Sequence, residues 1–192
     1  MKNIVSLVIL ALLGFSMISG CNSYNTFATS EEDLENAWAK VQSAYQQRAD
    51  LIPNLVSTVK GAADFEKETF TSLTEARAKA TSINVDISNA DDLAAFQEAQ
   101  GELSKGLGRL LAVMENYPQL QATAGFRDLQ VQLEGQENRI RVERNRFNDA
   151  VTTFNKSVKV FPANFFASIF GFSQRPQFEA EATAQEAPKV EF

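Results

Sequence analysis

Apolar residues recur along the chain at spacings that alternate between four and three, which is typical of helices that pack along a coiled-coil-like seam. In the first such stretch the repeated positions are Leu34, Trp38, Val41, Tyr45, Arg48, Ile52, Leu55, Val59 and Ala62. The preceding Ser30-Glu31-Glu32-Asp33 has the form of a capping box, so we expect this helix to begin near Ser30. Pro53 lies within the pattern and removes one amide donor, which predicts a kink or local loosening near Ala49.

The phase of the pattern changes around Gly61. Beyond this glycine a different stripe repeats Phe70, Leu73, Arg77 and Ala80. A glycine at a phase change favours a turn between two antiparallel helices, although one long kinked helix over residues 30–80 is an alternative. Residues 81–89 are then expected to form a loop.

Two longer helical patterns follow this loop. Ser88 and Asp91 form a second capping box, and the helix that they open repeats Leu93, Phe96, Gln100, Leu103, Leu107, Leu110 and Met114. Close approach of a neighbouring helix is expected at its glycines, Gly101, Gly106 and Gly108. Pro118 suits the first position of a helix, and beyond it an apolar residue recurs every seven positions, at Phe126, Leu133, Ile140, Phe147, Phe154 and Phe161.

Pro162 interrupts the last pattern before a short aromatic segment from Phe165 to Phe172. Residues 173–192 are rich in Ala, Glu, Gln and Pro, which predicts a flexible tail. Nothing in the chain alternates as a β-strand does. The sequence therefore predicts an all-α protein, most simply an antiparallel up-and-down bundle of four long helices over residues 30–172.

The beginning of the chain has the features of a secretory signal. Lys2 is followed by an apolar run from Ile4 to Ile18, which is short for a membrane span. The run ends in Ile18-Ser19-Gly20-Cys21, which resembles a bacterial lipobox: an aliphatic residue, two small residues and the cysteine that becomes the new N-terminus. We therefore predict a signal peptide over residues 1–20, lipidation of Cys21 and a tether over residues 21–29. The alternative is a free or buried cysteine behind an uncleaved anchor.

Composition excludes several classes of chemistry. The chain has no histidine, which removes Ser-His-Asp and Cys-His catalysis and the common zinc sites, and its single cysteine cannot form an internal disulfide. A formal net charge of −6 without basic clusters argues against nucleic-acid binding. We therefore expect no catalytic residues, no metal and no cofactor.

One loop resembles the start of a calcium site. Asn84, Asp86 and Ser88 have the alternate spacing of an EF-hand loop. The sixth and twelfth positions are Asn89 and Ala95, where that loop needs glycine and a bidentate glutamate. We interpret this stretch as a capped loop between helices.

Polar residues interrupt three of the helical seams. Arg48 falls on the seam of the first helix, Gln100 interrupts the stripe at 93–114, and the last helix loses its second stripe at Gln136-Glu137 and Glu143-Arg144. Because a buried guanidinium needs a partner, we predict a buried polar layer of Arg48, Gln100 and either Glu137 or Glu143. Such a layer fixes helix register, or alternatively forms a ligand or switch site.

Two further surfaces are candidates for docking. Phe165 and Phe166 either form a lid over one end of the bundle or dock a partner or the bilayer. Val190-Glu191-Phe192 could add a strand to a PDZ-type groove, with the Phe192 carboxylate held by backbone amides. The alternatives for this end are disorder, or Phe178 and Phe192 folded back onto the bundle.

Several blocks of the sequence resemble the LemA family. They are Gln47-Arg48-Ala49-Asp50-Leu51-Ile52-Pro53-Asn54-Leu55-Val56, Glu75-Ala76-Arg77, Glu115-Asn116-Tyr117-Pro118, Glu137-Asn138-Arg139-Ile140, Arg146-Phe147-Asn148, Phe154-Asn155, Phe161-Pro162, Gly171-Phe172 and Pro188-Lys189-Val190-Glu191-Phe192. The resemblance implies an antiparallel helical bundle outside the cytoplasmic membrane, with no established enzymatic activity. Two features depart from the family pattern: a lipobox replaces the usual transmembrane helix, and Ala62-Ala63 and Phe65-Glu66 replace Tyr-Ala and His-Glu.

These observations favour a non-catalytic, lipid-anchored scaffold or partner-binding protein on the periplasmic side of a bacterial inner or outer membrane. Its partners would be the membrane, through the lipid anchor, and an envelope protein whose identity the sequence does not give. The alternative is an envelope protein that binds a small ligand or a lipid. A filled core favours the scaffold, and a cavity beside Arg48 favours the binder.

Overall fold

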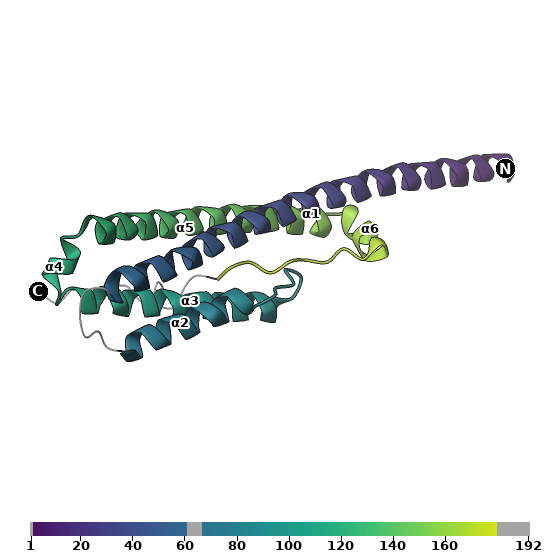
Figure 1. The fold of residues 1–192 in the computed structure, drawn as a ribbon. Coiled ribbons are helices and arrows are strands. Elements are labelled where there is room, and N and C mark those ends of the chain that lie inside the picture. Colours follow the sequence, from purple (N-terminus) through teal and green to yellow (C-terminus); the bar gives the residue numbers. More distant parts are fainter. Residues whose placement is uncertain (1, 61–66, 180–192) are drawn as a thin grey trace, which may run out of the picture.

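The structure is a computed structural model, and it describes residues 2–60 and 67–179. These residues form α1 (Lys2–Lys60), α2 (Lys67–Ser82), α3 (Ala90–Met114), α4 (Pro118–Gln121), α5 (Ala124–Lys159) and α6 (Ala163–Phe170). No strand occurs among them, so the predicted all-α class is confirmed. Successive long helices run in opposite directions, with α1 packed along α5 and α2 along α3 (Figure 1). The first part of α1 projects beyond the rest of the molecule (Figure 1).

The first helix begins much earlier than its capping pattern predicts. Instead of starting at Ser30, α1 runs unbroken through the expected tether, and the Ser30 hydroxyl donates to the carbonyl of Thr26 at 2.7 Å. The reason is packing, because Phe27 is fully buried and its ring lies 5.1 Å from that of Phe172. A buried contact of this kind outweighs a local capping signal. Within the part of the chain that is described, no helix is long and apolar enough to cross a membrane.

The two-helix alternative for residues 30–80 is the one that the structure adopts. The helices α1 and α2 are separate and run in opposite directions (Figure 1). Gly61 and Ala62 lie outside the described residues. Pro53 is inside α1 and does not end it.

The later elements follow the sequence pattern with three differences. All seven predicted stripe residues of α3 are buried, but the N-cap is Asn89, whose side chain accepts from the Asp91 amide, and not Ser88. Of the three glycines, only Gly106 meets a neighbour: an added Cβ would lie 3.3 Å from Leu73. In α5 the buried series is Phe126, Leu133, Ile140, Phe147 and Phe154, whereas Phe161 lies beyond the helix end and is exposed.

The core consists of two clusters. The aromatic half lies toward the α6 end, and its buried residues include Phe27, Trp38, Tyr45, Phe96, Phe147, Phe154 and Phe178. The aliphatic half lies toward α4, and its buried residues include Ile52, Leu55, Leu73, Leu103, Leu107, Leu110 and Leu133. Arg48 and Gln100 are buried polar residues, and along α1 Arg48 lies between Tyr45 of the aromatic half and Ile52 of the aliphatic half.

The segment after α6 differs from the flexible tail that its composition predicts. Residues 173–179 are extended and lie along the helices (Figure 1), and Phe178 is buried in the aromatic half. Burial of one phenylalanine ring accounts for this, since an apolar area of that size is worth about 1.5–3 kcal/mol. The fold-back alternative therefore holds for Phe178. Phe192 and the proposed PDZ-binding end lie outside the described residues.

Candidate functional site

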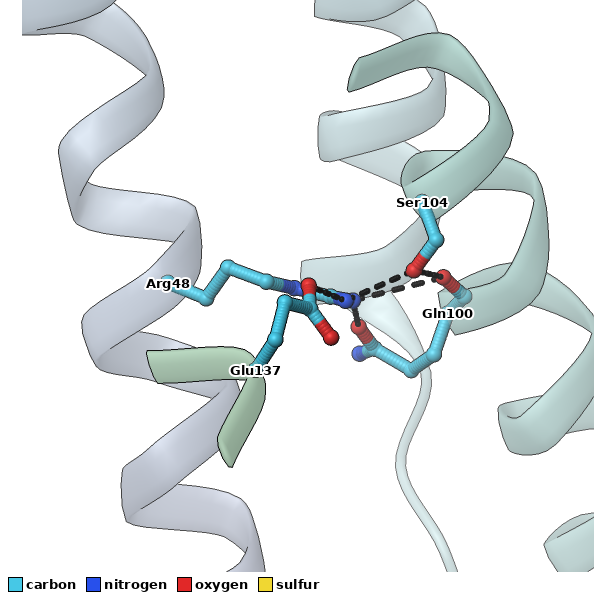
Figure 2. Close-up of polar contacts among 4 residues, drawn as sticks. All are labelled: Arg48, Gln100, Ser104 and Glu137. Atoms are coloured by element: carbon cyan, nitrogen blue, oxygen red, sulfur yellow. Dashed lines mark hydrogen bonds and ion pairs between the residues drawn. The ribbon is translucent and has the colours of Figure 1, made fainter. Parts of the chain in front are cut away.

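The predicted polar layer exists as a cluster around the Arg48 guanidinium (Figure 2). Its Nη1 donates to Glu137 Oε1 and to Ser104 Oγ, each at 2.7 Å. Its Nη2 donates to Gln100 Oε1 at 2.7 Å and to the Gln100 carbonyl at 3.3 Å. The Arg48 side chain is only 1% exposed, whereas that of Glu137 is 51% exposed. The arginine end of the layer is therefore buried, and the carboxylate end is accessible to solvent.

This cluster joins all four long helices. Arg48 comes from α1, Gln100 and Ser104 from α3, and Glu137 from α5. The Gln100 amide then donates to the Ala80 carbonyl of α2 at 3.1 Å. Because a helix that slid along its axis would break these bonds, the cluster fixes the register of each helix against the others.

Of the two candidate carboxylates, Glu137 enters the cluster and Glu143 does not. Glu143 lies further along α5, where it is buried and accepts a hydrogen bond from Arg146 at 2.8 Å. The guanidinium of Arg48 also lies over the Tyr45 ring, 5.2 Å from its centroid. This contact continues the polar cluster into the aromatic half of the core.

A second interhelix contact forms where Pro53 interrupts the hydrogen bonding of α1. Proline lacks the amide that would bond to the Ala49 carbonyl, four residues earlier. Arg77 of α2 supplies the replacement, because its Nε donates to that carbonyl at 2.8 Å. Its Nη2 also lies 3.8 Å from Asp50. The expected loosening near Ala49 is thus compensated by a side chain from the next helix.

Two asparagines of α5 hold the extended segment. The Asn155 side chain accepts from the Arg175 amide at 2.7 Å and donates to the Arg175 carbonyl at 2.9 Å. Asn148 makes the same pair of bonds with the backbone of Phe178, at 2.9 and 3.1 Å. A primary amide that bonds both groups of one residue replaces the partners that a neighbouring strand would provide.

The side chains of this segment add further contacts. The Phe178 ring packs 6.0 Å from Trp38 and 5.3 Å from Phe147. Arg144 lies 4.8 Å above the same ring, and Arg175 forms an ion pair with Glu31 of α1. The segment therefore closes one side of the aromatic half.

The predicted lipidation residue Cys21 and the predicted docking residues Phe165 and Phe166 lie near one another, where α1 passes α6. Cys21 is exposed. The neighbouring Gly20 is buried under Phe166, so that an added Cβ would lie 3.2 Å from that ring. Phe165 is on the outward side of α6 and is 64% exposed. Of the two phenylalanines, Phe166 thus packs against α1, and Phe165 is exposed with its ring edge-on to that of Phe166.

An open groove of about 390 Å³ lies on the polar surface between α2 and α3, and it is lined by Ser72, Glu75, Ala76, Lys79, Glu102, Lys105, Gly106 and Arg109. Lys79 donates to Glu102 at 2.8 Å, and this bond raises the pKa of Lys79. None of the Arg48 cluster residues lines the groove. Among the described residues, no group of His, Cys, Asp and Glu side chains could hold a metal ion.

Comparison with known proteins connects these contacts to a family. A family model described as LemA family matches residues 37–192. The chain belongs to the LemA family. It is 28% identical over 186 residues to the magnetosome proteins MamQ 1 and MamQ 2 of Paramagnetospirillum magneticum, covering 87% of this chain and 68% of each relative. It is 24% identical over 143 residues to Protein LemA of Metamycoplasma hominis, covering 74% of this chain and 63% of that protein.

The blocks that carry the LemA resemblance supply most of these interhelix contacts. The first block contributes Arg48, Pro53 and Gln47, and Gln47 accepts from Arg139 of a later block at 2.9 Å. Sequence reasoning missed the roles of Ser104, Arg77, Asn148 and Asn155. A signal existed for the asparagines, because they repeat at the same seven-residue interval as Phe147 and Phe154.

Proposed function

We propose that this LemA-family protein is a non-catalytic scaffold or partner-binding protein, held on the bacterial cell envelope by lipid on Cys21. The proposal rests on the contacts made by polar residues in the blocks that carry the LemA resemblance. Arg48, Arg77, Asn148 and Asn155 each bond to another part of the same chain. Residues that fix helix register and hold an extended segment create a rigid body rather than a reactive site.

The chemistry of the chain supports the same proposal. With no histidine and one cysteine, the groups left for catalysis are carboxylates, hydroxyls, lysines and tyrosines. The lipobox places the cysteine at the end of an apolar run, and Cys21 is exposed, so that its sulfur can accept a diacylglyceryl group. Attached acyl chains would contribute about 0.8 kcal/mol per buried methylene to membrane binding.

The binder alternative requires room beside Arg48. Four of the five guanidinium donors are engaged by Glu137, Ser104 and Gln100, and only Nε lacks a partner among the described residues. A ligand would therefore have to displace existing bonds. This occupancy favours the scaffold.

Metabolic labelling with an alkyne fatty acid tests the anchor. Wild-type protein should become labelled and Cys21→Ser should not, because the substitution removes the sulfur that accepts the lipid. Equal labelling of the two proteins would contradict the lipoprotein assignment.

Affinity capture from detergent-solubilised envelopes tests the scaffold role. An unrelated lipoprotein with the same tag is the matched control. The same envelope protein should be enriched at a constant ratio to the bait in independent captures, and Arg48→Ala should reduce this ratio per folded molecule. Recovery no different from that of the control lipoprotein would contradict the role.

A further inference from the structure

Two charge-free segments that are far apart in the sequence meet at one end of the molecule. Residues 3–30 and 160–174 contain no Asp, Glu, Lys or Arg. The first lies in α1 and the second includes α6, and the two pack together (Figure 1). Tyr24 joins them, with its ring 5.3 Å from Phe170 and 5.9 Å from Phe172.

The outward side of this end carries an aromatic patch that the core does not use. The patch consists of Phe161, Phe165, Ile169 and Phe170, which are 87%, 64%, 60% and 42% exposed. The opposite side of α6 is anchored, because Ala167 is buried in the aromatic half and Ala163 and Phe166 pack against that cluster. Large contiguous apolar patches that are exposed to solvent mark sites of contact with a protein partner or a membrane.

The surroundings of the aromatic patch identify the occupant as a bilayer. Lys156 and Lys159 lie exposed in the last turn of α5, directly before the patch. An uncharged aromatic surface with lysines at its edge matches the acyl boundary and anionic headgroups of a membrane interface. A charged protein partner would instead meet a surface that has no complementary charge at its centre.

Cys21 makes the same end membrane-proximal. Cleavage before Cys21 would remove Gly20 and uncover Phe166, so that the acyl chains would begin beside α6. Without cleavage, the apolar part of α1 before Cys21, with exposed residues such as Ile4 and Leu7, would extend from α6 toward the membrane instead. In either form the part of the chain that reaches the lipid begins beside α6, the helix that carries most of the aromatic patch.

We propose that the aromatic patch docks into the interfacial layer of the bilayer and sets the orientation of the bundle on the membrane. The proposal rests on the membrane anchorage given under the proposed function. The anchor alone would leave the bundle free to rotate on its attachment. A second contact through α6 fixes the angle between the α5 axis and the membrane surface, and with it the position of the Arg48 cluster above the membrane.

Depth-dependent quenching tests the proposal on the full-length protein. Phe165→Cys and Val131→Cys are each labelled with an NBD dye and reconstituted in vesicles of phosphatidylethanolamine and phosphatidylglycerol that contain spin-labelled lipid. Val131 is the matched control, since it is 67% exposed and lies on α5 roughly 40 Å from the α6 end. Quenching at position 165 should exceed that at position 131 at least twofold. Both variants should unfold at the wild-type midpoint, because both side chains are exposed.

The outcomes separate the patch from the anchor. Equal quenching at the two positions overturns the docking proposal, and so does a blue-shifted dye at 165 that spin-labelled lipid does not quench, which would indicate a protein occupant. The wild-type protein reports on the anchor, because an acylated Cys21 does not react with the dye. If wild-type protein does react, the lipid anchor is wrong, and the same quenching comparison is made in a Cys21→Ser background.

Discussion

The aromatic and aliphatic halves of the core are closed by different parts of the chain. In the aliphatic half, α1, α2, α3 and α5 all contribute buried residues. In the aromatic half α2 contributes none, and the extended segment, α6 and the α2–α3 loop provide the remaining cover. The buried residues of the aliphatic half thus all come from helices, whereas the aromatic half also needs the buried Phe178 of the extended segment.

The Arg48 cluster lies at the boundary between these two halves. Its partners come from every long helix, and its arginine extends over Tyr45 in the aromatic half. The cluster therefore connects the stability of the two halves. Pairing of the helices is sufficient to form the aliphatic half. The Arg48 cluster then fixes the axial positions of the helices in the aromatic half, so that the site in which Phe178 is buried is correctly formed.

Loss of the arginine should produce the largest effect. Arg48→Ala should lower the free energy of unfolding by about 3 kcal/mol, the low end for breaking a buried pair, because Glu137 is half exposed. Arg48→Met should cost less, since methionine restores the volume. Denaturant unfolding is followed by Trp38 fluorescence for the aromatic half and by circular dichroism for all helices. If the free energies of unfolding of both variants lie within about 0.5 kcal/mol of the wild-type value, the Arg48 cluster contributes too little stability to couple the two halves.

Removal of the asparagine clamps should affect the aromatic half specifically. Asn148→Ala and Asn155→Ala each delete two hydrogen bonds to the extended segment, so each should cost about 1–2 kcal/mol. Asn145→Ala is the matched control, because Asn145 is exposed on the same helix and carries the same change in helix propensity. Limited chymotrypsin digestion should accelerate after Phe178 in the two clamp variants only, because Phe178 is buried until the segment detaches. An unchanged cleavage rate would show that Phe178 holds the segment without them.

The two halves also differ in how far the sequence alone predicts them. Helical repeats identify the buried residues of α3 and the series from Phe126 to Phe154, because a helix places every such residue on one face. The choice of Glu137 over Glu143 depends on axial position between packed helices, which periodicity does not specify. Phe178 and its two clamps depend on an extended segment that no local pattern encodes. The buried Phe27 likewise overrides the capping signal at Ser30.

A smaller effect should appear at the Pro53 break, within the aliphatic half. Arg77→Met leaves the Ala49 carbonyl without its donor and should cost about 1 kcal/mol. In a Pro53→Ala background the restored amide can bond to that carbonyl, so the same substitution should cost clearly less. A double-mutant cycle by denaturant unfolding measures the coupling. Additive effects of the two substitutions would mean that Arg77 acts only through Asp50.

The smallest effect should be a pH dependence in the α2–α3 loop, which covers the aromatic half through Ile83, Val85 and Ile87. The Ser88 hydroxyl and amide donate to Asp86 Oδ1 at 2.6 and 2.8 Å, and these bonds hold the pKa of Asp86 below its ordinary value of 3.8.

The sign follows from linkage: the folded state binds the proton less readily, so this contribution to stability is present above pH 3.8 and is lost as the pH falls through the folded pKa. Ser88→Ala removes the stronger of the two bonds. Its stability should therefore fall below that of wild type near neutral pH, and the difference should shrink as the pH is lowered past the Asp86 pKa. Unfolding midpoints of both proteins across this range measure it, and a difference that stays constant with pH would assign the effect of Ser88 to loop packing rather than to the charge of Asp86.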